Sequence, residues 1–190
     1  VLVSVHNHGM LNSKQIEYLH FRENKNSKVI ALRRLKKLVE GGYLDHQWFG
    51  WKQYGNMQHF TITNKGAMIV ALSLGIDYEE VKIFSKKDIR NIEHTVLIGD
   101  FHIGLLKSGY SVLSYTADVH NTVKFKYKLD KVRIEPDGKG ELFSHKTNRN
   151  FEFMMEMDRG GKSYEQMTER ILKYEKYLLS KAYAKEYINF

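Results

Sequence analysis

Two acidic residues in the C-terminal half have the types and spacing of a divalent-cation site. Asp137 ends the segment Ile-Glu-Pro-Asp at residues 134–137, and Glu156 stands 19 residues later in a second segment that is rich in Phe and Met. Carboxylates that converge from two strand ends are ligands for Mg²⁺ or Mn²⁺, and such an ion can activate a water molecule. We therefore take Asp137, Glu156 and the neighbouring Asp158 as candidate catalytic or metal-binding residues.

The arrangement is similar to the core of PD-(D/E)xK nucleases, except at one position. In those cores a Lys two residues after the Glu helps to place the attacking water or to stabilise the phosphorane. Asp158 occupies that position here. We expect a nuclease-like domain that does not cleave DNA, unless Lys139, Lys162 or Lys173 supplies the missing cation.

A second group of residues, in the N-terminal half, could bind DNA. Ser27 can cap a helix over residues 28–40 that Gly41-Gly42 would end. At 100° per residue, five apolar side chains share the side that should face the core: Ala31, Leu32, Leu35, Leu38 and Val39. The other side carries Ile30, Arg33, Arg34 and Lys37, with Lys28 near the start. A recognition helix needs such a face for phosphates and base edges.

The segment after this helix predicts a two-stranded ribbon. Strands are expected near residues 43–51 and 58–63, because both are rich in aromatic and β-branched residues. The turn between them carries Lys52, Gln53 and Asn56, which suit contacts to the DNA backbone or the minor groove. A helix, a break, a second helix and a ribbon form the order of a winged helix-turn-helix domain. The candidate DNA-binding residues are Ser27, Lys28, Ile30, Arg33, Arg34, Lys37, Lys52, Gln53 and Asn56.

The candidate carboxylates and the candidate DNA-binding residues must be positioned by two different halves of the chain. We predict helices over residues 11–21, 65–74 and 77–88, and then a mostly apolar helix over 92–106. Strands are expected near 111–116, 123–129, 132–135 with 142–143, and 151–157. A final helix over 163–183 would bury the stripe Tyr164, Met167, Ile171, Tyr174 and Leu178. We expect an α+β or α/β chain, with a winged helix-turn-helix domain at 1–88 and a small nuclease-like α/β domain at 89–190.

Composition excludes several classes of protein. The chain has 42% hydrophobic residues, enough for a core, and no Cys for disulfides, zinc–thiolate sites or thiol catalysis. No run reaches the roughly 18 apolar residues of a membrane helix, so we expect a cytoplasmic protein with no membrane partner. Residues 1–90 hold 14 Lys/Arg and 8 Asp/Glu, and residues 91–190 hold 16 and 14, which sum to a net charge of +8. The basic N-terminal half favours a polyanionic partner.

Short segments in a consistent order resemble the replication-relaxation family of plasmids and other mobile elements. They include Leu32-Arg33-Arg34-Leu35 with Gly42-Tyr43-Leu44, Phe60-Thr61-Ile62-Thr63-Asn64-Lys65-Gly66, His94-Thr95-Val96, Pro136-Asp137 and Glu156-Met157-Asp158-Arg159-Gly160. The resemblance implies a winged helix followed by a nuclease-like domain, and a role in plasmid or phage DNA replication, relaxation or its control. In that family an Asp at the place of Asp158 is ordinary. His94 is expected to have a structural role.

We therefore expect a sequence-specific double-stranded DNA-binding protein that acts as a homodimer with other replication or relaxation proteins. No cofactor is required in this interpretation, although the carboxylates could take Mg²⁺ or Mn²⁺. One alternative is a Mg²⁺-dependent DNA nuclease that uses Asp137 and Glu156. A second alternative is a transcriptional repressor whose second domain senses a ligand or a peptide.

Overall fold

The computed structural model describes residues 1–51, 55–84, 92–117, 121–158 and 160–187. Its N-terminal half contains, in order, α1 (Leu2–His8), β1 (Leu11–Asn12), α2 (Ser13–Phe21), α3 (Ser27–Glu40), β2 (Leu44–Trp51), β3 (Gly55–Ile62) and α4 (Asn64–Leu74). The three strands form an antiparallel sheet in the order β1-β3-β2. The sequence predicted α3, β2, β3 and α4 closely, whereas α1 and β1 were not expected.

The core of this half lies between the helices and the sheet. Its fully buried side chains come from most of the elements, namely Val5, Leu11, Ile16, Leu35, Leu44, Phe60, Ile62 and Val70. Leu32, which was expected to face this core, is 42% exposed. The core contact of α3 is narrower than predicted, because only Ala31 and Leu35 are fully buried on that helix.

Local interactions explain where two of these helices begin. Asn12 caps α2, because its Oδ1 accepts the Gln15 N–H and the Gln15 Oε1 accepts the Asn12 N–H, both at 2.9 Å. Thr63 caps α4 by accepting the Gly66 N–H. Gly66 is required there for steric reasons, since a Cβ on it would lie 2.1 Å from the Tyr43 carbonyl oxygen.

The rest of the chain builds a second sheet and a separate ribbon. A 3₁₀ turn (Tyr78–Glu80) precedes α5 (Ile92–Lys107) and β4 (Ser111–Ala117). Next come β5 (Val123–Tyr127), β6 (Asp130–Ile134), β7 (Gly138–Ser144) and β8 (Arg149–Met155), and finally α6 (Tyr164–Leu179) and α7 (Ala182–Tyr187). The sheet has the order β4-β7-β8, and β5 pairs only with β6. The helix expected over 77–88 is reduced to the 3₁₀ turn among the described residues.

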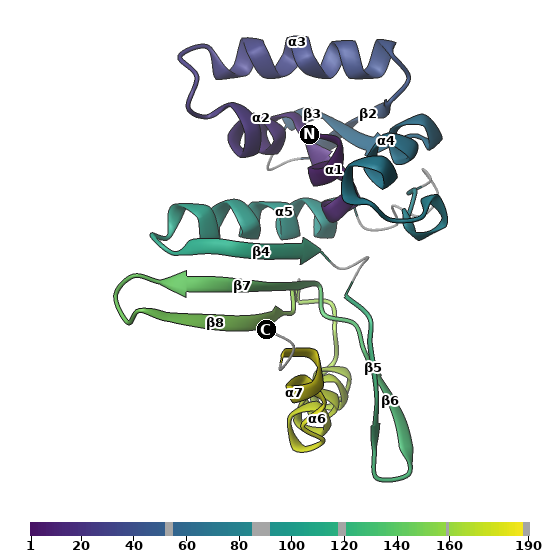
Figure 1. The fold of residues 1–190 in the computed structure, drawn as a ribbon, viewed down its shortest axis with the longest axis vertical. Coiled ribbons are helices and arrows are strands. Elements are labelled where there is room, and N and C mark those ends of the chain that lie inside the picture. The colour runs from purple at the N-terminus through teal and green to yellow at the C-terminus, as the bar shows by residue number, and fades with distance from the viewer. Residues whose placement is uncertain (52–54, 85–91, 118–120, 159, 188–190) are drawn as a thin grey trace.

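Helix α5 lies between the N-terminal half and strand β4 (Figure 1). On one side, the Gln15 side-chain amide donates to the Val96 carbonyl oxygen at 2.8 Å and to Asp100 Oδ1 at 2.9 Å. On the other side, the Tyr115 hydroxyl donates to the Ile98 carbonyl oxygen at 3.1 Å. The two halves therefore share α5, and the boundary expected near residue 88 falls in the undescribed segment 85–91.

Helix α6 turns a different face inward from the one that the apolar stripe predicted. Tyr177 is its buried residue, whereas Ile171 is 63% and Leu178 is 62% exposed. The inward face is partly polar, since Arg170 and Tyr174 contact carboxylates at the end of the second sheet. The predicted burial of Tyr164, Ile171 and Leu178 was therefore wrong.

The fold class is mixed α+β. Every strand pair among the described residues is antiparallel, so the α/β form of the expectation, which needs parallel strands joined by crossover helices, does not hold. No helix in the described part of the chain has the length and the apolar character needed to cross a bilayer.

Candidate functional site

Strand register brings Asp137 and Glu156 together. Gly138, the first residue of β7, pairs with Met155, the last residue of β8. Asp137 directly precedes this pair and Glu156 directly follows it, so the two carboxyl groups lie at the same end of the sheet. Arg170 on α6 approaches both: its Nη2 is 2.8 Å from Glu156 Oε2 and 3.9 Å from Asp137 Oδ1.

Asp137 is held by donors from two other elements. It is only 6% exposed, and the His94 Nε2 on α5 lies 3.1 Å from its Oδ1. The Met157 N–H donates to its Oδ2 at 2.7 Å. Burial alone raises the pKa of Asp137, but the His94 and backbone hydrogen bonds outweigh burial, together with the Arg170 charge. The net pKa lies below the ordinary value, so Asp137 is ionised at neutral pH.

Glu156 has the opposite shift. Burial raises its pKa, and the negative charge of Asp137 adds to that effect. The Tyr174 hydroxyl donates to Glu156 Oε1 at 2.5 Å. Burial also raises the pKa of Tyr174, and the carboxylate of Glu156 raises it further. Tyr174 therefore stays protonated and serves as a hydrogen-bond donor.

Three of the four oxygens of this carboxylate pair accept hydrogen bonds, from His94, the Met157 N–H and Tyr174. The fourth, Glu156 Oε2, is buried without a hydrogen-bond partner among the described residues and contacts Arg170 as an ion pair. Asp158, the third candidate, is exposed, and its Oδ1 accepts the Gly160 N–H in a local turn at 3.0 Å. Among the described residues, no group of three or more His, Asp or Glu side chains is placed to hold a metal ion. As arranged here, the carboxylates bind protein donors, and a metal ion would have to displace them.

The cation of the pair comes from a residue that the sequence analysis missed. Lys162 and Lys173 line the same cavity of about 340 Å³ as Arg170, but Lys173 pairs with Glu169 at 2.8 Å. Arg170 and Tyr174 are four residues apart on α6 and so share a face. Tyr174 belongs both to this face and to the predicted apolar stripe, so its spacing from Arg170 was the available signal.

The basic face of α3 is exposed. Lys28, Arg33, Arg34 and Lys37 point to solvent, and none of Lys28, Arg33 and Lys37 forms an ion pair with a described residue. Lys36 differs, because its Nζ lies 3.7 Å from Glu40 Oε1. Two other predicted DNA-binding residues are less accessible to a ligand. Ile30 is half-buried, and the Ser27 hydroxyl donates to Glu17 Oε1 at 2.6 Å.

The β2–β3 turn is only partly described. Asn56 on β3 is exposed and pairs with Gly50 on β2. Lys52 and Gln53, the other two predicted contacts of the turn, lie outside the described residues. The two strands of the hairpin extend beyond the β1 pairing with His59 and Phe60 as far as the pair of Trp51 with Gly55.

Taken together, the fold and the site define an α+β protein with an exposed basic helix and an internally neutralised carboxylate pair. The chain belongs to the replication-relaxation family, whose model matches residues 2–190. The resemblance drawn from the sequence is thereby confirmed, and membership points to a role in plasmid replication. No curated protein and no solved structure matches the chain significantly.

Proposed function

We propose that the chain binds double-stranded DNA in a sequence-specific manner and that α3 reads the bases. The observation that carries the proposal is the exposed basic face of α3, where Lys28, Arg33 and Lys37 have no acidic partner among the described residues. Arg and Lys side chains on one helix face can contact guanine edges and phosphates in the major groove. Lys36, in contrast, has an acidic partner four residues away in Glu40.

The elements around α3 support the same proposal. Helix, short strand, two helices and a hairpin follow one another in the order of a winged helix-turn-helix domain, and β1 closes the sheet against β3. In such a domain the second helix of the pair, here α3, enters the groove, and the hairpin contacts the backbone beside it. Helix α3 packs on α2 and on β2, which leaves its far side uncovered by any described element (Figure 1).

For residues 89–190 we propose a positioning role without catalysis. The carboxylate pair joins three elements, because His94 of α5 and Arg170 of α6 both contact it at the β7–β8 end of the sheet. Such contacts support a structural role for the pair. A homodimer fits the proposal because one recognition helix buries little surface, and two half-sites raise the affinity.

The test begins with selection of bound sequences from a random duplex pool. The proposal expects a defined sequence to be enriched and the selected duplex to remain intact with Mg²⁺ or Mn²⁺. An Arg33→Ala variant should lose the enriched sequence, whereas the control variant Lys146→Ala, on the β7–β8 turn, should keep it. Recovery of no preferred sequence by the wild-type protein would overturn specific DNA binding.

A further inference from the structure

The β5–β6 ribbon holds most of the positive charge of the C-terminal half. Residues 123–134 contain five Lys/Arg and one acidic residue, a balance of +4. Residues 91–190 as a whole hold 16 Lys/Arg and 14 Asp/Glu. Without the ribbon they would hold 11 and 13, a balance of −2, so this short hairpin alone makes the C-terminal half basic.

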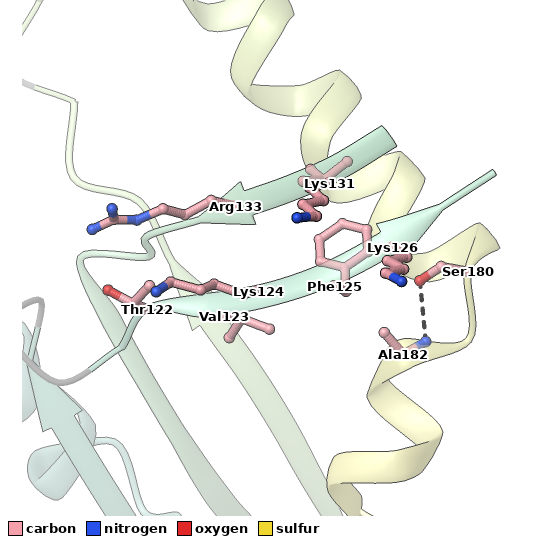
Figure 2. Close-up of a pocket in the computed structure, with 10 residues that line it drawn as sticks. Thr122, Val123, Lys124, Phe125, Lys126, Lys131, Arg133, Ser180 and Ala182 are labelled. Carbon is pink, nitrogen blue, oxygen red and sulfur yellow. Dashed lines mark hydrogen bonds between the residues drawn. The ribbon is translucent and has the colours of Figure 1, made fainter. Parts of the chain in front are cut away.

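Strand register places the cations opposite one another. Lys124 pairs with Arg133, and Lys126 pairs with Lys131. All four are exposed, and because side chains alternate along a strand, they share one face of the ribbon. Figure 2 shows the side chains of Lys124 and Arg133 extending in the same direction from the two strands.

The other face of the ribbon is apolar and packs on α6. The rings of Phe125 and Tyr177 meet edge to face, with centroids 5.3 Å apart, and Val132 and Ile134 are buried. The acidic residue of the turn also faces this helix, since Asp130 Oδ2 lies 3.6 Å from the Lys176 Nζ. The ribbon is therefore anchored on one face and presents cations on the other.

Like charges directly opposite each other destabilise a strand pair. Among the described residues, Arg133 has an acidic partner in Glu135, whereas Lys124, Lys126 and Lys131 have none. The cations also line a hollow of about 860 Å³ that extends from the ribbon to the turn at Ser180 and Ala182. A polyanion at this face would neutralise the repulsion that the protein itself leaves uncompensated.

We infer that the cationic face of the β5–β6 ribbon is a second binding site for double-stranded DNA, and that it contacts phosphates rather than bases. Lysines are point charges that attract phosphates without reading the sequence, and a two-stranded ribbon has the width to follow a groove. The ribbon projects from the part of the molecule opposite α3 (Figure 1). It therefore adds a site beyond the one in the proposed function and does not depend on it.

The test compares duplex binding by two matched double variants. Lys126→Gln with Lys131→Gln removes one cross-strand pair, and Lys146→Gln with Arg149→Gln removes two exposed cations from the β7–β8 turn. Binding to a random-sequence duplex is measured over a range of salt concentrations. Loss of two phosphate contacts should lower the slope of log K against log salt by about 1.8 and weaken binding roughly tenfold or more at 0.1 M salt. The β7–β8 variant should match the wild type.

The same measurements with Arg33→Ala and Lys37→Ala separate this inference from the proposed function. If the α3 variant keeps full affinity and specificity while the ribbon variant loses affinity, α3 is wrongly assigned and the ribbon site stands. If the ribbon variant matches the β7–β8 control, the ribbon site is overturned, whatever α3 does. Binding of the ribbon to phosphatidylserine vesicles instead of duplex would also overturn it. Thermal unfolding checks the fold, and the ribbon variant should be at least as stable as the wild type because the repulsion is reduced.

Discussion

His8 and His102 are hydrogen-bonded to each other across the two halves of the chain, with 2.9 Å between His8 Nε2 and His102 Nδ1. His8 Nδ1 also lies 2.8 Å from the Ser4 carbonyl oxygen, which can only accept. His8 therefore donates from Nδ1, and its Nε2 accepts the proton that His102 carries on Nδ1. His8 must be neutral for this arrangement, because a protonated ring could not accept at Nε2. The His102 ring stacks on the Tyr115 ring, and the His8 ring is tilted relative to it.

The first prediction concerns pH. Burial, together with the neighbouring His8, lowers the pKa of His102 to about 4. Because the unfolded chain takes up the proton near pH 6.5, the unfolded state binds more protons between pH 6.5 and 4. The free energy of unfolding should therefore be highest above pH 6.5 and fall as the pH drops toward 4. Denaturant unfolding at several pH values measures it.

A His102→Gln variant is the control for this prediction, since Gln can hydrogen-bond but does not titrate. The variant should show a shallower dependence between pH 6.5 and 4, with the remainder due to other buried His residues such as His59, whose pKa burial also lowers. An identical slope in the variant and the wild type would assign the effect to other groups. Asp137 does not account for it, because the His94 and Met157 hydrogen bonds and the Arg170 charge hold its pKa below the ordinary value of a carboxyl group, which lies below this pH range.

The second prediction concerns Arg170. Replacement by Met leaves the Asp137 and Glu156 carboxylates without their shared cation, and should cost about 1.5–3 kcal/mol of unfolding free energy. Adding Glu156→Gln to Arg170→Met should recover part of the loss, because one unpaired charge is removed. Denaturant titration of the single and double variants measures both. Equal stability of Arg170→Met and wild type would mean that the Arg170 contacts do not stabilise the fold.

The third prediction concerns the carboxylates as candidate catalysts. Asp137→Asn with Glu156→Gln should leave duplex affinity nearly unchanged, and the wild type should not nick the selected duplex with Mg²⁺ or Mn²⁺. The reason is that protein donors already occupy three of the four carboxylate oxygens, and the fourth, Glu156 Oε2, is ion-paired with Arg170. An agarose-gel relaxation assay on supercoiled plasmid measures nicking. Metal-dependent nicking that disappears in the double variant, while binding persists, would establish the nuclease alternative.

The fourth prediction concerns the recognition face. Arg33→Ala or Lys37→Ala should weaken binding to the selected duplex without unfolding the protein, because both side chains are exposed. A lost base contact costs about 1–3 kcal/mol and relaxes the preference at one position, whereas a lost phosphate contact weakens all duplexes alike. Titrations against the selected duplex and single-base variants distinguish the two. Wild-type affinity in both variants at low salt would remove α3 from the interface.

The sequence predicted the order of the helices and strands better than it predicted which side of each helix is buried. Local signals such as Gly41-Gly42 and the aromatic and β-branched residues of 58–63 have local causes, and the structure places the end of α3 and strand β3 where those signals lie. The inward face of α6 could not be found in this way. It depends on where the register of β7 and β8 puts two carboxylates, so that Arg170 and Tyr174 face inward while Ile171 is left in solvent.

The N-terminal contacts also depended on tertiary structure. Helix α1 was not expected from the sequence, yet it forms and buries His6 and His8. The partner of His8 is 94 residues away, and no spacing rule within one segment could reveal it. The pairing of Asp137 with Glu156 was accessible from the sequence because both flank strand ends. The final helix was also considered as a source of their cation through Lys173, but Lys173 pairs with Glu169 and Arg170 supplies the cation.

Both halves of the chain contact α5, so the N-terminal half cannot be separated from this helix without losing contacts. Gln15 is 1% exposed, and both acceptors of its side-chain amide, the Val96 carbonyl and Asp100, lie on α5. A fragment that ends near residue 88 would lack both protein acceptors of the Gln15 amide. It would also expose to solvent the surfaces of α1 and α2 that α5 covers. The shortest segment that contains α3 and keeps these contacts therefore extends to Lys107, the last residue of α5. A recombination event that joins the N-terminal half to another domain must therefore include α5, and with it His94, which contacts Asp137.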